Sequence, residues 1–313
     1  MKIRFLKAIT FFAIFLFIGS CVKQEESSQK KLLVVTTLFP LYDFAKRIGK
    51  DKVSVTLLLP PGVEAHSYEP TPEDVLKINK AKVFVYTGLY MEPWVEKVLK
   101  SIDNKNLVIV DSSRGIEFLE KKEEDDRDHH HKNVGKIDPH IWLDFLNAKT
   151  MVDNMLQGFI KADKENSEFY KNNAKMIKKE LNNLDEKYKK GLSDCKTRDF
   201  YHGGHFAFNY LANRYNLHYV SVYTGISPDE EPQPKRVAQI IRDIKNKKLK
   251  YIYYEEFLSP RIAEIISKEA GVTMLKINAG HNVSKEQLER GISFFDIMEE
   301  NLKQLKVGLQ CQQ

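Results

Sequence analysis

Four histidines are placed where a folded chain could use them to hold a metal ion. His66, His140, His205 and His281 lie 74, 65 and 76 residues apart. These separations exclude a local zinc finger, whose ligands lie within a few dozen residues of one another. Neutral imidazole is a common ligand for zinc and also accepts manganese, iron and copper. A single loop histidine is more often solvated, so the prediction of a metal site depends on all four together.

The pattern around these histidines predicts an α/β protein. Short β-branched or aromatic runs alternate with helical stretches, which is typical of parallel sheets covered by helices. All four histidines fall at or near connections between a strand and a helix. Ligands bind to parallel α/β folds at the carboxyl ends of the strands, so the fold is expected to bring these side chains together. The expected strands are Leu32–Thr36, Val53–Leu59, Val83–Tyr86, Val108–Val110, Asp199–His202, Tyr219–Tyr223, Tyr251–Tyr254 and Thr273–Ile277.

A long helical stretch separates two halves of similar architecture. It runs from about Ala148 to beyond Leu181 and contains no proline. Such a helix is long enough to cross from one lobe to another. In the second half, the stretch Lys285–Leu305 is expected to form one closing helix. The remaining expected helices are Leu41–Ile48, Thr71–Asn79, Glu92–Ser101, Ala207–Tyr215, Pro234–Lys245 and Pro260–Ala270.

The N-terminus predicts export and lipid attachment. A basic start precedes an apolar run from Ala8 to Gly19, which is too short to span a bilayer. Small residues then lead to Cys21, which fits cleavage before this cysteine and acylation of its thiol. The alternatives are an ordinary signal peptide with an incidental cysteine and a short membrane anchor. Residues 1–20 are therefore assigned to a lipoprotein signal peptide and 21–31 to a flexible tether.

Charge and cysteine content limit the remaining function classes. The formal net charge is only +6, and three of the positive charges lie in the signal peptide, so nucleic acid is not expected as a partner. After cleavage, Cys195 and Cys311 are the cysteines other than the acylated one. Outside the cytoplasm they are expected to form a disulfide, and the alternative is two buried thiols.

Residues 120–137 form an acidic and histidine-rich loop that cannot build a core. Within it, Asp128 and the run His129, His130 and His131 offer an auxiliary site of low affinity for a metal ion. The alternative is a solvated charged loop with no such role.

Three segments resemble one known family over nearly the whole mature chain. They are Pro61–Pro70 (PGVEAHSYEP), Asp138–Asp144 (DPHIWLD) and His205–Tyr210 (HFAFNY), and weaker support comes from Glu231-Pro232 and Glu255–Pro260. The chain resembles the cluster A-I (cluster 9) metal-binding proteins of zinc and manganese ABC transporters. The resemblance implies two α/β lobes joined by one long rigid helix. It places the N-terminal lobe at residues 32–145, the linking helix at 146–175 and the C-terminal lobe at 176–313.

The resemblance implies His66, His140 and His205 as metal ligands. The fourth position varies among members, and some use a glutamate immediately before the first histidine, where this chain has Ala65. Near the end of the last strand, where an acid is common, it has His281, which we predict to be the fourth ligand. The alternatives are Glu255, Glu256 or a position filled by water. Asp144 and Glu69 are candidates to orient the ligating rings.

A site of four histidines favours zinc over manganese, which prefers carboxylates. The resemblance implies an extracytoplasmic, lipid-anchored and non-enzymatic protein that captures Zn²⁺ and delivers it to the permease of an ABC importer. We expect it to be a monomer. The alternatives are a manganese-binding member of the family, a zinc-dependent hydrolase and a metal-dependent adhesin. The hydrolase is disfavoured because the chain has no HExxH helix and no nucleophile elbow.

Overall fold

The first half of the chain builds one parallel sheet. The computed structural model describes residues 31–120, 137–223 and 232–312. Strands β1 and β2 pair in register from Leu32 with Val53 to Thr36 with Leu57. Side chains alternate across β1, so that Val34 faces one apolar cluster and Val35 another on the opposite face. The sheet has the order β2-β1-β3-β4, and its strands are β1 (Leu32–Thr36), β2 (Val53–Leu57), β3 (Val83–Tyr86) and β4 (Val108–Asp111).

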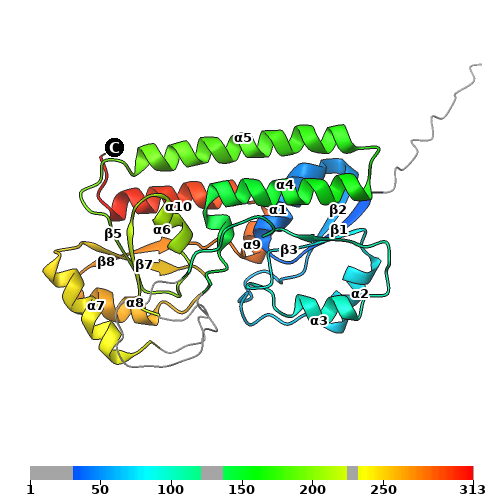
Figure 1. Cartoon of the computed structure of the whole chain (residues 1–313). Helices are drawn as coiled ribbons and strands as arrows, with labels where there is room; N and C mark the ends of the chain where they lie inside the picture. Colours follow the sequence, from blue (N-terminus) through cyan, green and yellow to red (C-terminus); the bar gives the residue numbers. More distant parts are fainter. Residues whose placement is uncertain (1–30, 121–136, 224–231, 313) are drawn as a thin grey trace, which may run out of the picture. The chain divides into compact units, whose positions relative to one another are not determined.

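The second half repeats this order in a second parallel sheet. Its strands follow the order β6-β5-β7-β8, so in each half the first strand lies between the second and the third. The predicted eight strands and their grouping into two parallel α/β halves are confirmed (Figure 1). The strands of this sheet are β5 (Asp199–His202), β6 (His218–Ser221), β7 (Tyr251–Glu255) and β8 (Thr273–Ile277).

Helices cover both sheets. Local signals explain where they start. The Thr71 side chain accepts a hydrogen bond from the backbone N–H of Asp74, and the Asp74 carboxylate accepts one from the backbone N–H of Thr71. Pro72 lies in the first turn. The helices of the first half are α1 (Phe39–Gly49), α2 (Pro72–Lys80) and α3 (Val95–Lys100). Those flanking the second sheet include α6 (Asn209–Arg214), α7 (Pro234–Asn246) and α8 (Arg261–Ala270).

The long helical stretch is two helices, which corrects the single linking helix expected at 146–175. Helix α4 (Phe145–Ala162) ends at Asp163, and α5 (Ser167–Gly191) begins after Asn166. The Asp163 carboxylate accepts hydrogen bonds from the Asn166 amide and from the Tyr170 hydroxyl. A short polar side chain that bonds locally in this way competes with helix continuation. The helix that joins the halves is α5, because it packs against both α1 and α10 (Phe294–Gly308) (Figure 1).

The closing helix is also interrupted, so the single helix expected from Lys285 to Leu305 was wrong. Helix α9 (Lys285–Glu289) is short, and the chain turns at Gly291 with φ +72° before α10 begins. Ser293 caps α10 in a reciprocal pair with Asp296. A residue with positive φ cannot continue a right-handed helix, and glycine adopts it without a steric penalty.

One continuous apolar core joins the two halves. It includes Val34 of the first sheet, Phe200 of the second and Trp142 between them. Phe294 at the start of α10 packs edge-on against Phe44 of α1, with ring centroids 5.3 Å apart. Among the described residues, no helix is both long and apolar enough to cross a membrane.

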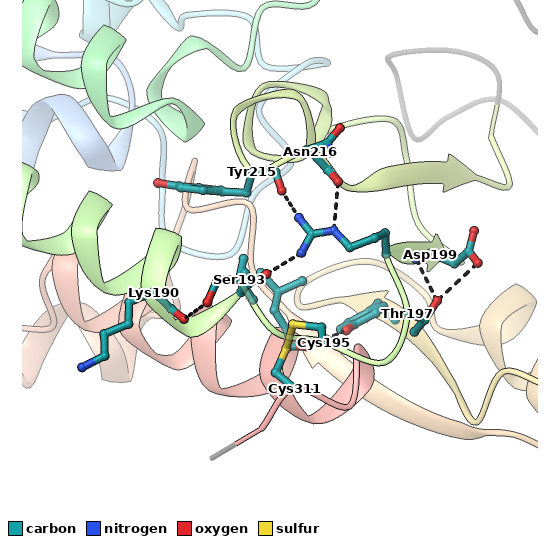
Figure 2. Close-up of a disulfide and its surroundings, with 12 residues drawn as sticks. Lys190, Ser193, Cys195, Thr197, Asp199, Tyr215, Asn216 and Cys311 are labelled. Atoms are coloured by element: carbon teal, nitrogen blue, oxygen red, sulfur yellow. Dashed lines mark hydrogen bonds between the residues drawn. A yellow bond between two sulfur atoms is a disulfide. The ribbon is translucent and has the colours of Figure 1, made fainter.

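The predicted disulfide between Cys195 and Cys311 is present (Figure 2). It joins the connection between α5 and β5 to the segment that follows α10, and the two cysteines are separated by 116 positions in sequence. Backbone hydrogen bonds run alongside it, from Lys196 N to Gln310 O at 3.2 Å and from Gln312 N to Asp194 O at 2.9 Å. The C-terminal segment is thus attached to the start of the second sheet by both a covalent bond and hydrogen bonds.

Candidate metal centre

Three histidines from both halves of the chain direct their Nε2 atoms toward one point. The Nε2 atoms of His66 and His140 lie 3.1 Å apart, and those of His140 and His205 lie 3.3 Å apart. One ligand atom from each of the three lies within 4.8 Å of the others. A tetrahedral zinc ion with Zn–N bonds of about 2.0–2.1 Å separates its ligand nitrogens by roughly 3.3–3.4 Å. The spacing of these nitrogens therefore fits one small cation.

His140 is fixed by the acid two residues before it. The Asp138 Oδ1 atom accepts from the backbone N–H of His140 at 3.0 Å and from its ring Nδ1 at 2.7 Å. Both side chains are fully buried. Because the Nδ1–H of His140 donates a hydrogen bond to Asp138, the neutral ring presents the lone pair of Nε2 to the other histidines.

The Asp138 segment is itself held by the second half of the chain. The hydroxyl of Tyr210 in α6 donates to the Asp138 carbonyl at 3.2 Å and accepts from the Leu119 N–H at 2.9 Å. Glu120 and Ile137 form an isolated antiparallel bridge beside this contact. The residues that lead into His140 are thus fixed on both sides of the segment 121–136.

His205 is oriented by Glu255, at the end of β7. The ring Nδ1 of His205 and Glu255 Oε2 are 2.5 Å apart, and both side chains are buried. Gly204 makes this approach possible, because a β-carbon there would lie 2.7 Å from Cε1 of His202 and 3.2 Å from Cβ of Glu255. His205 therefore presents Nε2 in the same way as His140. The two lone pairs face each other at 3.3 Å, an arrangement that calls for a proton or a cation between them.

His281 borders this group of three without belonging to it. Its ring centroid lies 6.4 Å from that of His66 and 6.0 Å from that of His205. The side chain is buried, and its Nδ1 has no hydrogen-bond partner among the described residues. A buried nitrogen without a partner is costly, so a ligand for it is expected. Its position at the carboxyl end of β8 agrees with the sequence prediction of where a fourth ligand lies.

Burial and mutual proximity set the charges of the histidines. Burial lowers the pKa of His66 and His140 well below the ordinary value, and the neighbouring histidines lower it further. Burial also lowers the pKa of His281. For His205 burial acts in the same direction, but the Glu255 carboxylate outweighs it and the pKa is raised. The pKa of His205 is therefore shifted in the opposite direction from those of the other three histidines.

Comparison with known proteins identifies the family. Residues 34–308 match the family model described as "Zinc-uptake complex component A periplasmic". The chain belongs to this family. It is 37% identical over 305 residues to the high-affinity zinc uptake system protein ZnuA of Bacillus subtilis, with 95% of each chain covered. It is 36% identical to the zinc-binding lipoprotein AdcA of Streptococcus pneumoniae over 93% of its own length, but spans only 58% of that protein.

Solved structures agree with this assignment. The Zn(II)-bound ZnuA-like domain of Streptococcus pneumoniae AdcA is 35% identical and superposes with a TM-score of 0.75, covering 89% of this chain and 99% of that domain. The family resemblance found in the sequence is confirmed, and so is the fold class of two parallel-sheet α/β halves.

The acids proposed from sequence to orient the histidines were wrong. Asp144 caps α4, where its Oδ1 accepts from Leu146 N at 2.7 Å, and it also pairs with Arg214. Glu69 is exposed. The carboxylates that contact the rings of His140 and His205 are those of Asp138 and Glu255. Asp138 could have been found from its spacing, because an aspartate side chain commonly accepts a hydrogen bond from the backbone N–H two residues later, which here is that of His140.

The two glutamates considered as alternative ligands differ in their contacts. Glu255 Oε2 is bonded to His205, whereas its Oε1 is buried without a hydrogen-bond partner among the described residues. The Glu256 carboxylate accepts from Lys276 at 2.9 Å and from Asn278 at 2.7 Å. Sequence analysis missed Glu64, whose charge acts on His205 and His281 and whose Oε1 is buried without a hydrogen-bond partner among the described residues. Cys21, Asp128 and the run His129, His130 and His131 lie outside the described residues.

Proposed function

We propose that this chain captures a zinc ion outside the cytoplasm and delivers it to the permease of an ABC-type importer. The observation that carries the proposal is the convergence of three Nε2 atoms, two of which are fixed as lone-pair donors by buried carboxylates. Its relatives are named for zinc uptake and zinc binding, which supports the choice of ion.

Zinc is favoured over manganese by the chemistry of the donors. We propose His66, His140, His205 and His281 as the ligands, a set made of nitrogen alone. Imidazole suits zinc, whereas manganese is better served by carboxylates and water. The acids of the site, Asp138 and Glu255, bond to the Nδ1 atoms of two ligands and raise their basicity.

The remaining parts of the proposal concern how the protein works in the cell. We propose that acylation of Cys21 attaches it to the membrane, that it acts as a monomer, and that it performs binding without catalysis. A zinc hydrolase keeps one coordination position open for water. The buried His281 ring beside His66 and His205 instead offers a fourth nitrogen.

Metal competition on the purified full-length chain tests the proposal. We expect one tightly bound Zn²⁺ per chain, retained against a moderate chelator and not displaced by an excess of Mn²⁺. Titration with a chromophoric chelator gives the stoichiometry and affinity. Displacement of zinc by manganese would contradict the choice of metal. A bound ion with a freely exchangeable water and hydrolytic turnover would contradict the function itself.

A further inference from the structure

The loop that carries His66 makes hydrogen bonds to the second half of the chain as well as within itself. Pro60 and Pro61 lack a backbone N–H, so they cannot donate. Gly62, which has a φ of +77°, donates its N–H to the carbonyl of Val283 at 2.9 Å. Val283 lies two residues after His281, so a backbone bond already connects the two histidine-bearing segments.

Asn282 makes the connection much stronger. Its side-chain amide donates to Pro60 O at 2.9 Å and to Val63 O at 2.6 Å, more than 200 residues away in sequence. Its Oδ1 accepts from the N–H of Val283 at 2.8 Å. The residue is only 1% exposed. Removing its amide would take one bond from each carbonyl, and Pro60 O would keep only the bond from Val63 N at 3.2 Å.

The segment around Asn282 is attached to the first half at further points. The His281 carbonyl accepts from the N–H of Phe39, the first residue of α1, at 3.1 Å. The indole N–H of Trp142, two residues after His140, donates to the Ala279 carbonyl at 2.7 Å. None of these bonds uses a nitrogen of the four histidines that we propose as ligands, so all of them can form without a metal ion.

We propose that Asn282 is a positioning residue that ties the His66 loop to the His281 segment and thereby slows the release of the bound metal. This inference rests on the proposed function. A ligand held in place before the ion arrives loses less freedom when it binds. Changes of this kind act mainly on dissociation, so the release rate is the quantity that Asn282 should govern.

The test compares zinc release from wild type, Asn282→Ala and Asn282→Asp, with each full-length protein loaded with Zn²⁺ and mixed with excess chelator in a stopped-flow instrument. The aspartate keeps the acceptor for Val283 but removes both donors to the loop. Two lost hydrogen bonds of about 1 kcal/mol each correspond to a release rate raised about tenfold or more. We expect this rise with one zinc still bound per chain and an association rate changed less than twofold.

Asn104 provides a matched control. Its amide also donates to two backbone carbonyls, those of Asn79 and Ala81, each at 2.9 Å, and its Oδ1 accepts from the N–H of Asn106. These contacts stay within the first half of the chain. Asn104→Ala should therefore lower the melting temperature but change the release rate less than twofold.

Hydrogen exchange in the metal-free protein gives a second measurement, which does not depend on zinc release. In metal-free protein, the amide of Gly62 should exchange slowly, and Asn282→Asp should accelerate it. Release at the wild-type rate from both Asn282 variants, equal acceleration by Asn104→Ala, or an unprotected Gly62 amide would overturn the inference. A wild type that binds no zinc would instead overturn the proposed function.

Discussion

At the scale of single residues, the protonation of two rings prepares the site for a cation. Asp138 and Glu255 each accept a hydrogen bond from the Nδ1–H of a histidine, so that the Nε2 lone pairs of His140 and His205 face each other. Burial lowers the pKa of His140, whereas the Glu255 carboxylate raises the pKa of His205. A zinc ion must displace any proton held between these two nitrogens, because metal ligands bind in the deprotonated form.

The fourth ligand is tested by His281→Ala. If His281 completes the coordination, its loss should weaken zinc binding by at least about tenfold, since even partners outside the coordination sphere contribute about 10–100-fold. Competition with a chelator of known affinity measures the change. His218→Ala is the control, because this histidine is exposed on β6 and pairs with Asp199. Equal affinity of His281→Ala and wild type would remove His281 from the site and leave the fourth position to water or to Glu64.

The ends of the strands that precede the histidines could be predicted from the sequence, whereas the contact of the Glu255 carboxylate with the His205 ring could not, for a physical reason. His66, His205 and His281 each follow a strand, and strand ends can be read from short apolar runs. Glu255 meets His205 across 50 residues, through the pairing of β7 with β5. A contact of this kind depends on the register of two strands, which local sequence does not specify. Asn282 was missed for the same reason, since its partners lie in the other half of the chain.

At the scale of elements, α5 connects the halves through one buried ion pair as well as through apolar contacts. Arg214 of α6 donates to both oxygens of Asp185 in α5, each at 2.7 Å. The Tyr215 hydroxyl adds a third bond at 2.8 Å. Helix α6 directly follows the loop that carries His205, so the ion pair between Arg214 and Asp185 holds the end of that loop in place.

The pH dependence of unfolding should reveal this ion pair. Burial alone would raise the pKa of Asp185, but the bonds from Arg214, Lys189 and Tyr215 outweigh it and lower the pKa to about 2. The stability that Asp185 contributes is therefore fully present above pH 3.8 and is lost as the pH falls toward 2. Asp185→Asn should cost about 1–2 kcal/mol at pH 6, and the difference from wild type should shrink below pH 4.

Urea unfolding of metal-free protein across this pH range measures the effect. Glu299→Gln in α10 is the control, because Glu299 forms an exposed ion pair with Lys187, which lies on α5 like Asp185. Exposed pairs contribute at most about 1 kcal/mol and usually less. A difference between Asp185→Asn and wild type that persists unchanged down to pH 2.5 would show that the carboxylate charge is not what stabilises the contact.

Helix existence was predicted more reliably than helix continuity. The two interruptions occur where short polar side chains bond locally, at Asp163 and at Ser293. The interruption before α10 could have been predicted, because a serine followed three residues later by an acid is a helix-capping pattern. The first depends partly on Tyr170, whose hydroxyl reaches Asp163 only once α5 has formed.

At the scale of the whole molecule, the described chain is two similar sheets sharing one core, with the candidate site at the carboxyl ends of their strands. Both sheets place the first strand of their half between the second and the third. His66 follows β2, His205 follows β5 and His281 follows β8, so these histidines lie beyond the carboxyl ends of strands in both sheets. The shared core and the bonds of Asn282 connect the two halves near the site. Helix α5 packs against α1 and α10, and the disulfide attaches the segment after α10 to the connection between α5 and β5.

Because the disulfide makes none of the contacts that position the histidines, we predict that its removal lowers stability without changing metal affinity. The disulfide closes a loop of 116 residues, for which the chain-entropy model gives roughly 4–5 kcal/mol and measured values are commonly about 2–4 kcal/mol. Replacing Cys195 and Cys311 together by serine should lower the free energy of unfolding of metal-free protein by about 2–4 kcal/mol. Zinc affinity should change less than twofold, because the bonds that position the histidines are unaltered. Denaturant unfolding and chelator competition, each repeated on reduced wild type, measure the two quantities. Weakened zinc binding at unchanged stability would mean that the C-terminal attachment, rather than the contacts around Asn282, positions the ligands.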